Sequence, residues 1–323
     1  MIQEEVMSWL LDSDPSIKWQ VMRDLMDAPE PDVAAVRSRV SVEGYGANLL
    51  ASQREDGTWA GEAWNPTLDS TMHALWLLQE LGVDQNNHAV KKAIQKVKEQ
   101  VHWRGWDRDG EWHGFDHVGN PYFLGEVEPC INGQVVVGGA YFGQDVEWIM
   151  DRLLRDQLAD GGWNCEIEYG STRSSFNTTI CVLEALLQYE KTFGKRPEVT
   201  EARLKGQEYF LERHLMRRKS TGELLQVDRR GSESFTDLAF PPWWHYDVLR
   251  GLDYLRKAGV EPDIRVEEAI KLLQSKRRLD GRWPLERLHG GKMLIPWDEV
   301  EGQPSRWNTL RALRVLKWYS KYV

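Results

Sequence analysis

The sequence contains few of the features that mark secreted or membrane-spanning proteins. Only three of its 323 residues are cysteine, and an odd number without regular spacing favours reduced thiols inside the cell over a disulfide framework. The N-terminus is acidic, whereas a secretory signal begins with basic residues. No apolar run approaches the roughly 18 residues that a spanning helix needs. We therefore expect a cytoplasmic protein without a transmembrane segment, and peripheral contact with a membrane stays open.

Excess positive charge and short cofactor motifs are also lacking. The chain has 41 Lys and Arg against 50 Asp and Glu, a net charge of −9. Binding of nucleic acid depends on neutralising phosphates with basic side chains, so no nucleic-acid partner is expected. There is no phosphate-binding loop, dinucleotide fingerprint or nucleophile elbow. Cys130, Cys165, His73 and His245 could together hold zinc, but their spacing is not that of metal ligands. We expect neither a metal nor another cofactor.

Tryptophan is present in unusual number, with 16 residues. Most of them fall in predicted connections or at predicted helix starts. The indole ring is large and its N–H group needs a hydrogen-bond partner when buried. Tryptophans gathered in connections therefore indicate either an aromatic wall around a shared space or stacking that holds the connections together.

The pattern of apolar residues predicts an all-α fold, because they recur at spacings of three and four and alternating runs are scarce. The predicted helices span residues 2–12, 15–27, 31–54 (one helix or two), 67–81, 88–103, 131–143, 145–158, 176–193, 199–217, 245–258, 264–278 and 308–322. Charged amphipathic helices such as 146–158 alternate with more apolar helices such as 131–142. A helix that is apolar around most of its circumference must be covered on most sides. The apolar helices are therefore expected to form an inner layer and the charged ones an outer layer.

One short string recurs after charged helices. Its copies are Asp56-Gly57-Thr58-Trp59, Asp109-Gly110-Glu111-Trp112, Asp160-Gly161-Gly162-Trp163 and Asp280-Gly281-Arg282-Trp283, with a degenerate copy at residues 220–223. A glycine in the left-handed conformation can end a helix, and a tryptophan two residues later can fold back over that end. Gln53 and Gln157 each precede such a tryptophan by six positions and could bind unpaired helix-end carbonyls. We interpret the string as a structural corner rather than a catalytic motif.

Repeats of about 50–60 residues indicate a stacked or closed array. Together with the alternating helices they predict an (α/α)6 toroid, a ring of about six inner helices inside about six outer ones. Because no linker or low-complexity run divides the chain, residues 1–323 are expected to form a single domain. Residues 1–42 would supply N-terminal helices that complete or cap the ring.

The two copies that carry glutamine, Gln53…Gly57-Thr58-Trp59 and Gln157…Gly161-Gly162-Trp163, resemble the QW repeats of squalene–hopene cyclases and related triterpene cyclases. Protein prenyltransferase β subunits share the α/α toroid of that family. The resemblance covers residues 40–320 and implies an isoprenoid or similar apolar ligand. The sequence departs from both activities, since it has no Asp-x-Asp-Asp acid motif and no Asp-x-Cys zinc motif. Asn177 stands near the place of the zinc-binding histidine, and 323 residues allow only one toroid.

Long connections from outer to inner helices, for example 104–130 and 279–307, are expected to carry the functional site, because long ordered loops are usually functional. A polar residue recurs where each inner helix is predicted to begin. These residues are Asp69, Asn132, Asn177, His245 and Asn308. They are interpreted either as N-caps of their helices or as a polar ring at the mouth of a cavity.

The candidate catalytic residues are Asp69, His245 and Asp247. A histidine in the first helical turn would have its charged form disfavoured by the helix dipole, so His245 could act as a neutral hydrogen-bonding group or general base. A packed histidine without a catalytic role is the alternative. Asp247 lies two positions further on, so the two side chains would not face each other on a helix. Asp69, the acid candidate, would share a helix face with His73, as an acid–base pair or as an ordinary contact.

The candidate substrate-binding residues are Trp64, His73, Glu128, Asn132, Asn177, Trp243, Trp244, Trp307 and Asn308. The preferred function is a cavity protein related to terpenoid cyclases and prenyltransferases, because π faces stabilise cations such as carbocations. A glycoside hydrolase or lyase on the same fold, and a binding or scaffold protein without chemistry, remain alternatives. An apolar pocket would favour the first, facing carboxylates the second and a filled interior the third.

Overall fold

The computed structural model describes residues 2–104, 107–108, 111–112, 117–225 and 234–322. These residues are mainly helical, and they include one short antiparallel pair of strands, β1 (Asp107–Arg108) and β2 (Glu111–Trp112). None of the described helices is long and apolar enough to cross a membrane. The chain divides into two compact units. Unit 1 comprises Met1–Arg39, Gln207–His289 and Trp297–Val323, and unit 2 comprises Val40–Gly206 and Gly290–Pro296.

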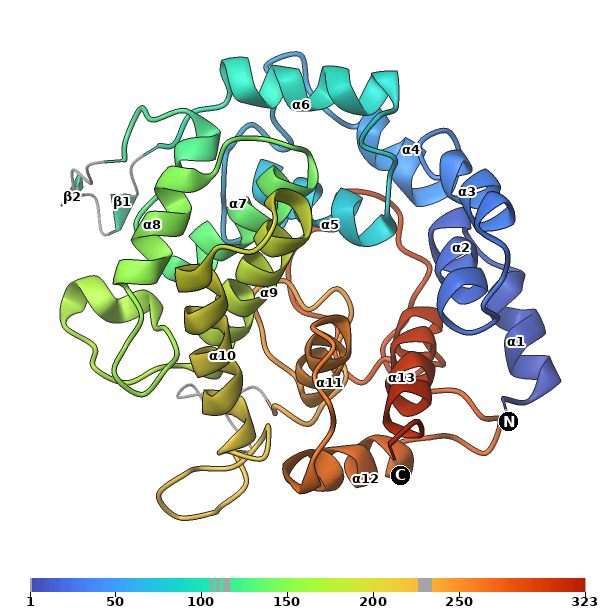
Figure 1. Ribbon diagram of the computed structural model, residues 1–323. Helices are drawn as coiled ribbons and strands as arrows, with labels where there is room; N and C mark the ends of the chain where they lie inside the picture. Colours follow the sequence, from blue (N-terminus) through green and yellow to red (C-terminus); the bar gives the residue numbers. More distant parts are fainter. Residues whose placement is uncertain (1, 105–106, 109–110, 113–116, 226–233, 323) are drawn as a thin grey trace. The chain divides into compact units, whose positions relative to one another are not determined.

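Unit 2 is organised around one helix that is buried along its length. Its helices are α4 (Gly44–Ala51), α5 (Thr71–Leu81), α6 (His88–Gln100), α7 (Pro129–Tyr141), α8 (Glu147–Arg155) and α9 (Phe176–Phe193), with the 3-10 turns η1 (Tyr122–Leu124) and η2 (Cys165–Tyr169) and the first part of α10 (Pro197–Leu211). α7 is buried from Pro129 to Ala140 and packs between α5 and α9 (Figure 1). Gly133 permits the close approach of α9, because a Cβ atom there would lie 2.7 Å from the carbonyl oxygen of Cys181.

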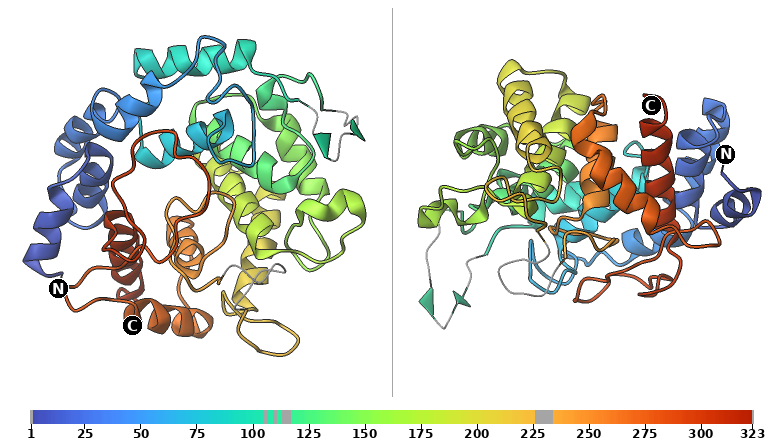
Figure 2. Two further views of the ribbon diagram at one scale, coloured as in Figure 1. Left: turned by 180° about the vertical axis from the view of Figure 1, so that it is seen from behind. Right: turned by 90° about the horizontal axis from the view of Figure 1, so that it is seen from below.

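Unit 1 is held by a buried ion pair between helices. Its elements are α1 (Glu4–Leu11), α2 (Pro15–Asp24), α3 (Glu30–Arg39), the end of α10, α11 (Val248–Lys257), η3 (Ile264–Val266), α12 (Glu267–Ser275) and α13 (Arg306–Tyr319). α13 packs against α11 and α2, and α11 and α13 lie side by side in both views of Figure 2. The Arg314 guanidinium of α13 binds Asp253 of α11 at 2.8 Å and Asp24 of α2 at 3.3 Å. Arg314 and Asp253 are buried, and Arg256 also binds Asp253 at 2.9 Å, so these buried charges compensate one another.

The burial of the helices confirms the predicted division into two kinds. α8 buries only Ile149, Met150 and Leu153, and α12 buries only Ala269, Ile270 and Leu273. By contrast α5 buries every residue from Thr71 to Leu78. The amphipathic helices therefore cover the apolar ones within each unit, as their sequences indicate.

Three copies of the repeated string form the same corner. The indole Nε1 of Trp59, Trp163 and Trp283 donates to the carbonyl oxygen of Leu49, Leu153 and Leu273, at 2.9, 2.7 and 2.7 Å. Each of these leucines is the third residue from the end of its helix, α4, α8 or α12. Carbonyl groups in the last turn have no partner within the helix. The tryptophan therefore folds back and binds a helix-end carbonyl, which confirms the structural interpretation.

The residue six positions before each tryptophan completes the corner. Gln53 donates to the carbonyl oxygens of Gly57 and Ala93, at 3.0 and 2.9 Å. Gln157 does the same with Gly161 and Ala202, at 2.7 and 2.8 Å. The amides therefore tie the turn to the following amphipathic helix, α6 or α10, rather than to the end of their own helix. In the third corner Arg277 replaces glutamine and donates to Gly281 at 3.2 Å.

The glycine of each corner has the predicted left-handed conformation. Gly57, Gly161 and Gly281 have φ values of 80°, 93° and 80°. At Gly57 and Gly161 a Cβ atom would also lie 2.8 Å from a backbone oxygen of the next amphipathic helix. The copy at 109–112 falls partly outside the described residues. The degenerate copy keeps a left-handed glycine, Gly222 with φ 71°, but has no tryptophan to cover the helix end.

Helix existence is confirmed throughout, and the largest error is at the end of α10, which stops at Leu211 rather than 217. Two helix starts also differ from the prediction. α5 begins at Thr71 rather than 67, and α11 at Val248 rather than 245. Leu68 and Trp243 have φ values of 64° and 51°, outside the right-handed helical region. The apolar pattern continues across these positions, and periodicity alone does not reveal the change in backbone conformation.

Candidate functional site

Two stacks of aromatic rings lie in unit 1, on the segments that precede α11 and α13 and in the first turn of α13. In the first stack His245 lies between Trp244, with ring centroids 3.6 Å apart, and His289, at 3.7 Å and nearly parallel. In the second, Phe240 stacks on Trp307 at 4.4 Å and on Trp297 at 5.9 Å. Trp244, His289 and Trp297 are partly exposed, whereas the other three are buried. We name these six residues the aromatic cluster.

Buried arginines hold the backbone of the cluster. Arg250 of α11 donates to the carbonyl oxygens of Trp243 and His245, at 2.9 and 2.6 Å. Arg311 of α13 donates to the carbonyl oxygen of Ala239 at 2.9 Å, and its guanidinium lies 5.6 Å from the centre of the Phe240 ring. Charged hydrogen bonds from rigid helices fix this segment more firmly than neutral ones would. The rings of the cluster are therefore positioned before any ligand binds.

Burial disfavours the charged forms of three ionisable groups near the cluster. It lowers the pKa of His289 to about 2, with further lowering by His245 and Arg287. Burial also raises the pKa of Asp247 and of Glu299. The charge of Arg311 opposes the rise at Asp247, and the hydrogen bond from Ser305 opposes the rise at Glu299. In neutral His289 one ring nitrogen donates a hydrogen bond and the other accepts one. Because the ring carries no charge, the stack is compatible with an apolar ligand.

The predicted residues His245, Asp247 and Asn308 occupy positions different from those expected. His245 lies before α11, and its Nδ1 is 3.3 Å from the carbonyl oxygen of Pro242. Asp247 is the N-cap of α11 and accepts from the backbone N–H of Arg250 at 2.8 Å. Asn308 donates to the carbonyl oxygens of Pro284 and Leu238, at 3.0 and 3.3 Å, and so joins two connections. A helix dipole therefore does not act on His245 from within a first turn.

The N-cap interpretation of the five aligned polar residues is wrong. The caps of α5, α7, α9, α11 and α13 are Ser70, Glu128, Ser175, Asp247 and Ser305. The side chains of Ser175, Asp247 and Ser305 accept a backbone N–H group at these positions. The predicted residues fall one to four positions away, and for α9, α11 and α13 a nearby Ser or Asp supplies the side-chain acceptor instead.

Trp307 contributes a buried polar group to the cluster. Its side chain is 1% exposed, and its Nε1 has no hydrogen-bond acceptor within the described part of the chain. A buried N–H group without an acceptor is unfavourable by about 1–3 kcal/mol. A ligand or water carrying an acceptor would remove this cost at the second stack.

In unit 2 the predicted pair of Asp69 and His73 is not formed as expected. Asp69 lies before α5 and accepts from Asn65 Nδ2 at 2.8 Å and Thr67 Oγ1 at 2.7 Å. His73 is buried in α5 with its Nδ1 2.8 Å from Ser70 Oγ. Burial lowers the pKa of His73 to about 3, although the charge of Asp69 opposes the shift. His73 is therefore neutral at pH 7. Trp64, also predicted, is partly exposed.

Asn132 positions an acidic residue that the sequence analysis did not select. Its Oδ1 accepts from the backbone N–H of Glu126, and its Nδ2 donates to the Glu126 carbonyl, both at 2.8 Å. The Glu126 side chain is buried, and burial together with the charge of Glu128 raises its pKa to about 8. Glu126 is therefore largely protonated at pH 7. Asn177, the other predicted amide in unit 2, is partly exposed in the first turn of α9.

The cysteines also differ from expectation. The odd number of cysteines predicts reduced thiols, whereas a disulfide joins Cys130 in the first turn of α7 to Cys165 in η2. The two cysteines are 35 residues apart in the sequence, but their Cα atoms lie only 6.0 Å apart. The third cysteine, Cys181, is buried in α9 and keeps its thiol.

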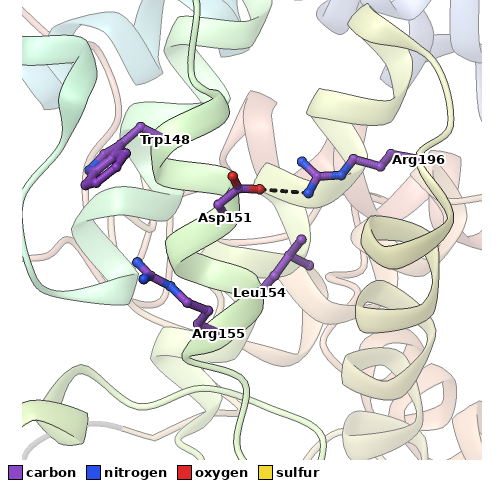
Figure 3. Close-up of a pocket in the computed structure, with 5 residues that line it drawn as sticks. All are labelled: Trp148, Asp151, Leu154, Arg155 and Arg196. Atoms are coloured by element: carbon purple, nitrogen blue, oxygen red, sulfur yellow. Dashed lines mark hydrogen bonds and ion pairs between the residues drawn. The ribbon is translucent and has the colours of Figure 1, made fainter.

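A surface pocket lies on the outer side chains of unit 2 (Figure 3). It is lined by Trp148, Asp151, Leu154 and Arg155 of α8 and by Arg196 at the start of α10. The Arg196 guanidinium binds Asp151 at 2.7 Å and Glu147 at 3.1 Å. Because these charges are paired across an exposed surface, the pocket is interpreted as a contact between helices.

Comparison with known proteins gives structural neighbours only. A variant of the type II terpene cyclase MstE from Scytonema, in complex with geranylgeranyl dihydroxybenzoate, matches with a TM-score of 0.44 and 15% identity, over 98% of this chain and 88% of that one. A second, ligand-free variant of MstE matches with a TM-score of 0.43 and 16% identity, over 96% and 87%. No protein-family model matches the chain, and no curated protein does.

Proposed function

We propose that the protein binds an apolar, isoprenoid-like molecule and that the aromatic cluster forms part of the binding surface. The observation that carries the proposal is the pair of ring stacks, each with one or two partly exposed members. Flat aromatic faces fixed in place present apolar area at little entropic cost. The neutral state of His289 supports an apolar ligand, since no ionised imidazole has to be desolvated there.

The expected roles of the predicted residues remain part of this proposal. Trp244 and Trp307 are assigned as lining, with His245 as a polar group within the first stack. Among the acids Glu126 is now preferred to Asp69 as a proton donor, because a carboxyl with a pKa of about 8 keeps its proton at pH 7. The toroid expected from the sequence is also retained as a proposal, and the pairing of buried with amphipathic helices in each unit supports it.

Binding of farnesol, measured by native mass spectrometry and isothermal titration calorimetry, tests the proposal. Trp244→Leu should weaken binding about five- to tenfold, because one stacking face contributes roughly 0.5–1.5 kcal/mol beyond its area. Trp148→Leu is the matched control, since Trp148 is 63% exposed and lies on α8 outside the cluster. Squalene and a maltooligosaccharide of similar size serve as comparison ligands.

Equal affinity of the two variants for farnesol would contradict the placement of the site. Binding of the oligosaccharide but neither isoprenoid would contradict the ligand class. Because Trp244 is already partly exposed, its replacement is expected to leave the far-ultraviolet circular dichroism and the unfolding midpoint close to those of the unmodified protein.

A further inference from the structure

Three potential metal ligands come together at the N-terminal end of α7 in unit 2. Glu128 is the N-cap of α7, Cys130 lies in its first turn, and Cys165 belongs to η2. The ligand atoms that these residues offer all lie within 4.8 Å of one another. The site lies entirely within unit 2 and does not depend on the function proposed above.

We propose that, when its cysteines are reduced, the protein binds a zinc ion through Glu128, Cys130 and Cys165. Two thiolates with a carboxylate are a donor set that suits zinc better than magnesium or calcium, which prefer oxygen ligands alone. In a tetrahedral site with metal–sulfur bonds of about 2.3 Å, two sulfur atoms lie about 3.7 Å apart. The Cα–Cα distance of 6.0 Å between the cysteines accommodates that separation by small side-chain rotations.

The surroundings of the three residues favour negatively charged ligands. α7 is 13 residues long, and the positive end of its dipole faces the first turn, where Cys130 lies. This field favours the thiolate form of the cysteine. The carboxylate of Glu128 already contacts the sulfur of Cys130, with Oε2 3.6 Å from Sγ. Two ligands from one helix end are therefore directed to the same point.

Neighbouring hydrogen bonds orient Cys165, which is the third ligand, and also Glu128. Thr178 of α9 donates to the Cys165 sulfur at 3.2 Å, and its hydroxyl oxygen accepts from the Cys165 backbone N–H at 3.2 Å. The Glu128 backbone N–H donates to Glu126 at 2.6 Å. Supporting contacts of this kind orient ligands in metal sites. Because Glu128 and Cys165 are partly exposed, solvent can reach the metal, and three protein ligands leave a fourth position for water.

Disulfide formation and zinc binding exclude each other at this site. Reduction by a phosphine breaks the bond between the two sulfur atoms, and the phosphine supplies the two electrons and leaves as its oxide, taking oxygen from water. Zinc binding then displaces one proton from each thiol. The oxidised protein should therefore bind no zinc here, whereas the phosphine-reduced protein should bind one ion.

The test uses the full chain, reduced with a phosphine and freed of metal with a chelator under anaerobic conditions. Zinc is titrated in competition with a chromophoric zinc indicator, and cobalt is substituted to reveal thiolate-to-metal charge-transfer absorption. We expect one equivalent in the unmodified protein and in Cys181→Ser, the matched cysteine control outside the site. Cys130→Ser and Cys165→Ser should each lose the charge-transfer band and weaken zinc binding at least a hundredfold. Glu128→Gln should keep the band but weaken binding about tenfold or more.

A second measurement needs no variant. Zinc should protect Cys130 and Cys165 of the reduced protein from alkylation by iodoacetamide, as seen by peptide mass spectrometry. The proposal is overturned if the reduced protein binds no zinc, or if Cys181→Ser loses binding as fully as Cys130→Ser. It is also overturned if the two cysteines cannot be reduced while the protein stays folded, or if zinc leaves their alkylation rates unchanged.

Discussion

At the scale of the residue, buried ionisable groups make the stability of this protein dependent on pH. Burial raises the pKa of Glu126 to about 8 and lowers the pKa of His73 to about 3. Both groups are uncharged at pH 7, and their effects on stability oppose each other between about pH 4.5 and 6.5, where the two pH ranges overlap. The unfolded chain protonates His73 only below about pH 6.5, and then stability falls as the pH falls. Above that value Glu126 dominates.

Replacing Glu126 by glutamine tests this interpretation. Below its unfolded pKa of 4.5 the Glu126 carboxyl is protonated in both states. Between that value and about 8, the unfolded chain releases the proton and the folded chain keeps it. The free energy of unfolding therefore falls as the pH rises, by at most about 1.4 kcal/mol per unit. A glutamine side chain cannot ionise, so Glu126→Gln should show a flatter profile in urea unfolding between pH 6.5 and 8.5. At pH 8.5 the variant should be more stable by about 1–3 kcal/mol.

The control for this prediction is Glu261→Gln, because Glu261 is an exposed glutamate in the connection before η3. Its profile should coincide with that of the unmodified protein. If Glu126→Gln kept the same dependence on pH, then the Glu126 carboxyl would be ionised in the folded protein. It would then be unsuitable as a proton donor at neutral pH.

At the scale of the element, the tryptophan corners join α4, α8 and α12 to the segments that follow them. Trp163 is fully buried, and its indole N–H group binds the Leu153 carbonyl of α8 at 2.7 Å. Trp163→Phe removes the donor and leaves a buried carbonyl without a partner, together with a small cavity. We expect a loss of about 2–4 kcal/mol in the free energy of unfolding.

Trp148→Phe provides a comparison on the same helix, because Trp148 is 63% exposed. It should change stability by less than about 0.5 kcal/mol. Hydrogen exchange should locate the effect of Trp163→Phe in the last turn of α8. A uniform effect along α8, or equal destabilisation by both variants, would show that the corner hydrogen bond does not hold the helix end.

The same elements explain what the sequence could predict. Periodicity identifies helices, so the pairing of buried with amphipathic helices follows from it, and a glycine-tryptophan string identifies a corner. The residues that were missed depend on contacts between distant segments. Cys130 meets Cys165 across 35 residues, and Glu126 is buried and held by Asn132 of α7. α11 begins three residues later than predicted because the extended backbone of its N-cap, Asp247, has no signature in hydrophobic spacing.

At the scale of the whole molecule, the order of segments along the chain interleaves the two units. Unit 1 takes its first segment from residues 1–39 and its last from 297–323, whereas unit 2 is nearly complete in 40–206. The last segment carries α13, and its Arg314 binds Asp253 and Asp24 of two other helices in unit 1. Unit 1 is therefore expected to require the C-terminal segment 297–323 in order to fold, whereas unit 2 is not.

A truncated chain that ends at Pro296 tests whether unit 1 needs the C-terminal segment and whether unit 2 folds without it. Without α13, Asp253 loses its closest partner but keeps Arg256 at 2.9 Å, so the loss should be smaller than the about 3–5 kcal/mol of a buried charge left without any partner. The apolar faces of α11 and α2 also lose their cover. Hydrogen exchange followed by mass spectrometry should show lost protection in α2 and α11 but preserved protection in α7 and α9.

Replacement of Arg314 by methionine in the full chain keeps the packing and removes only the charge, so it should reproduce a part of the loss in α11. Equal loss of protection in α7 and in α11 after truncation would mean that the units fold as one, and preserved protection in both would mean that α13 is dispensable.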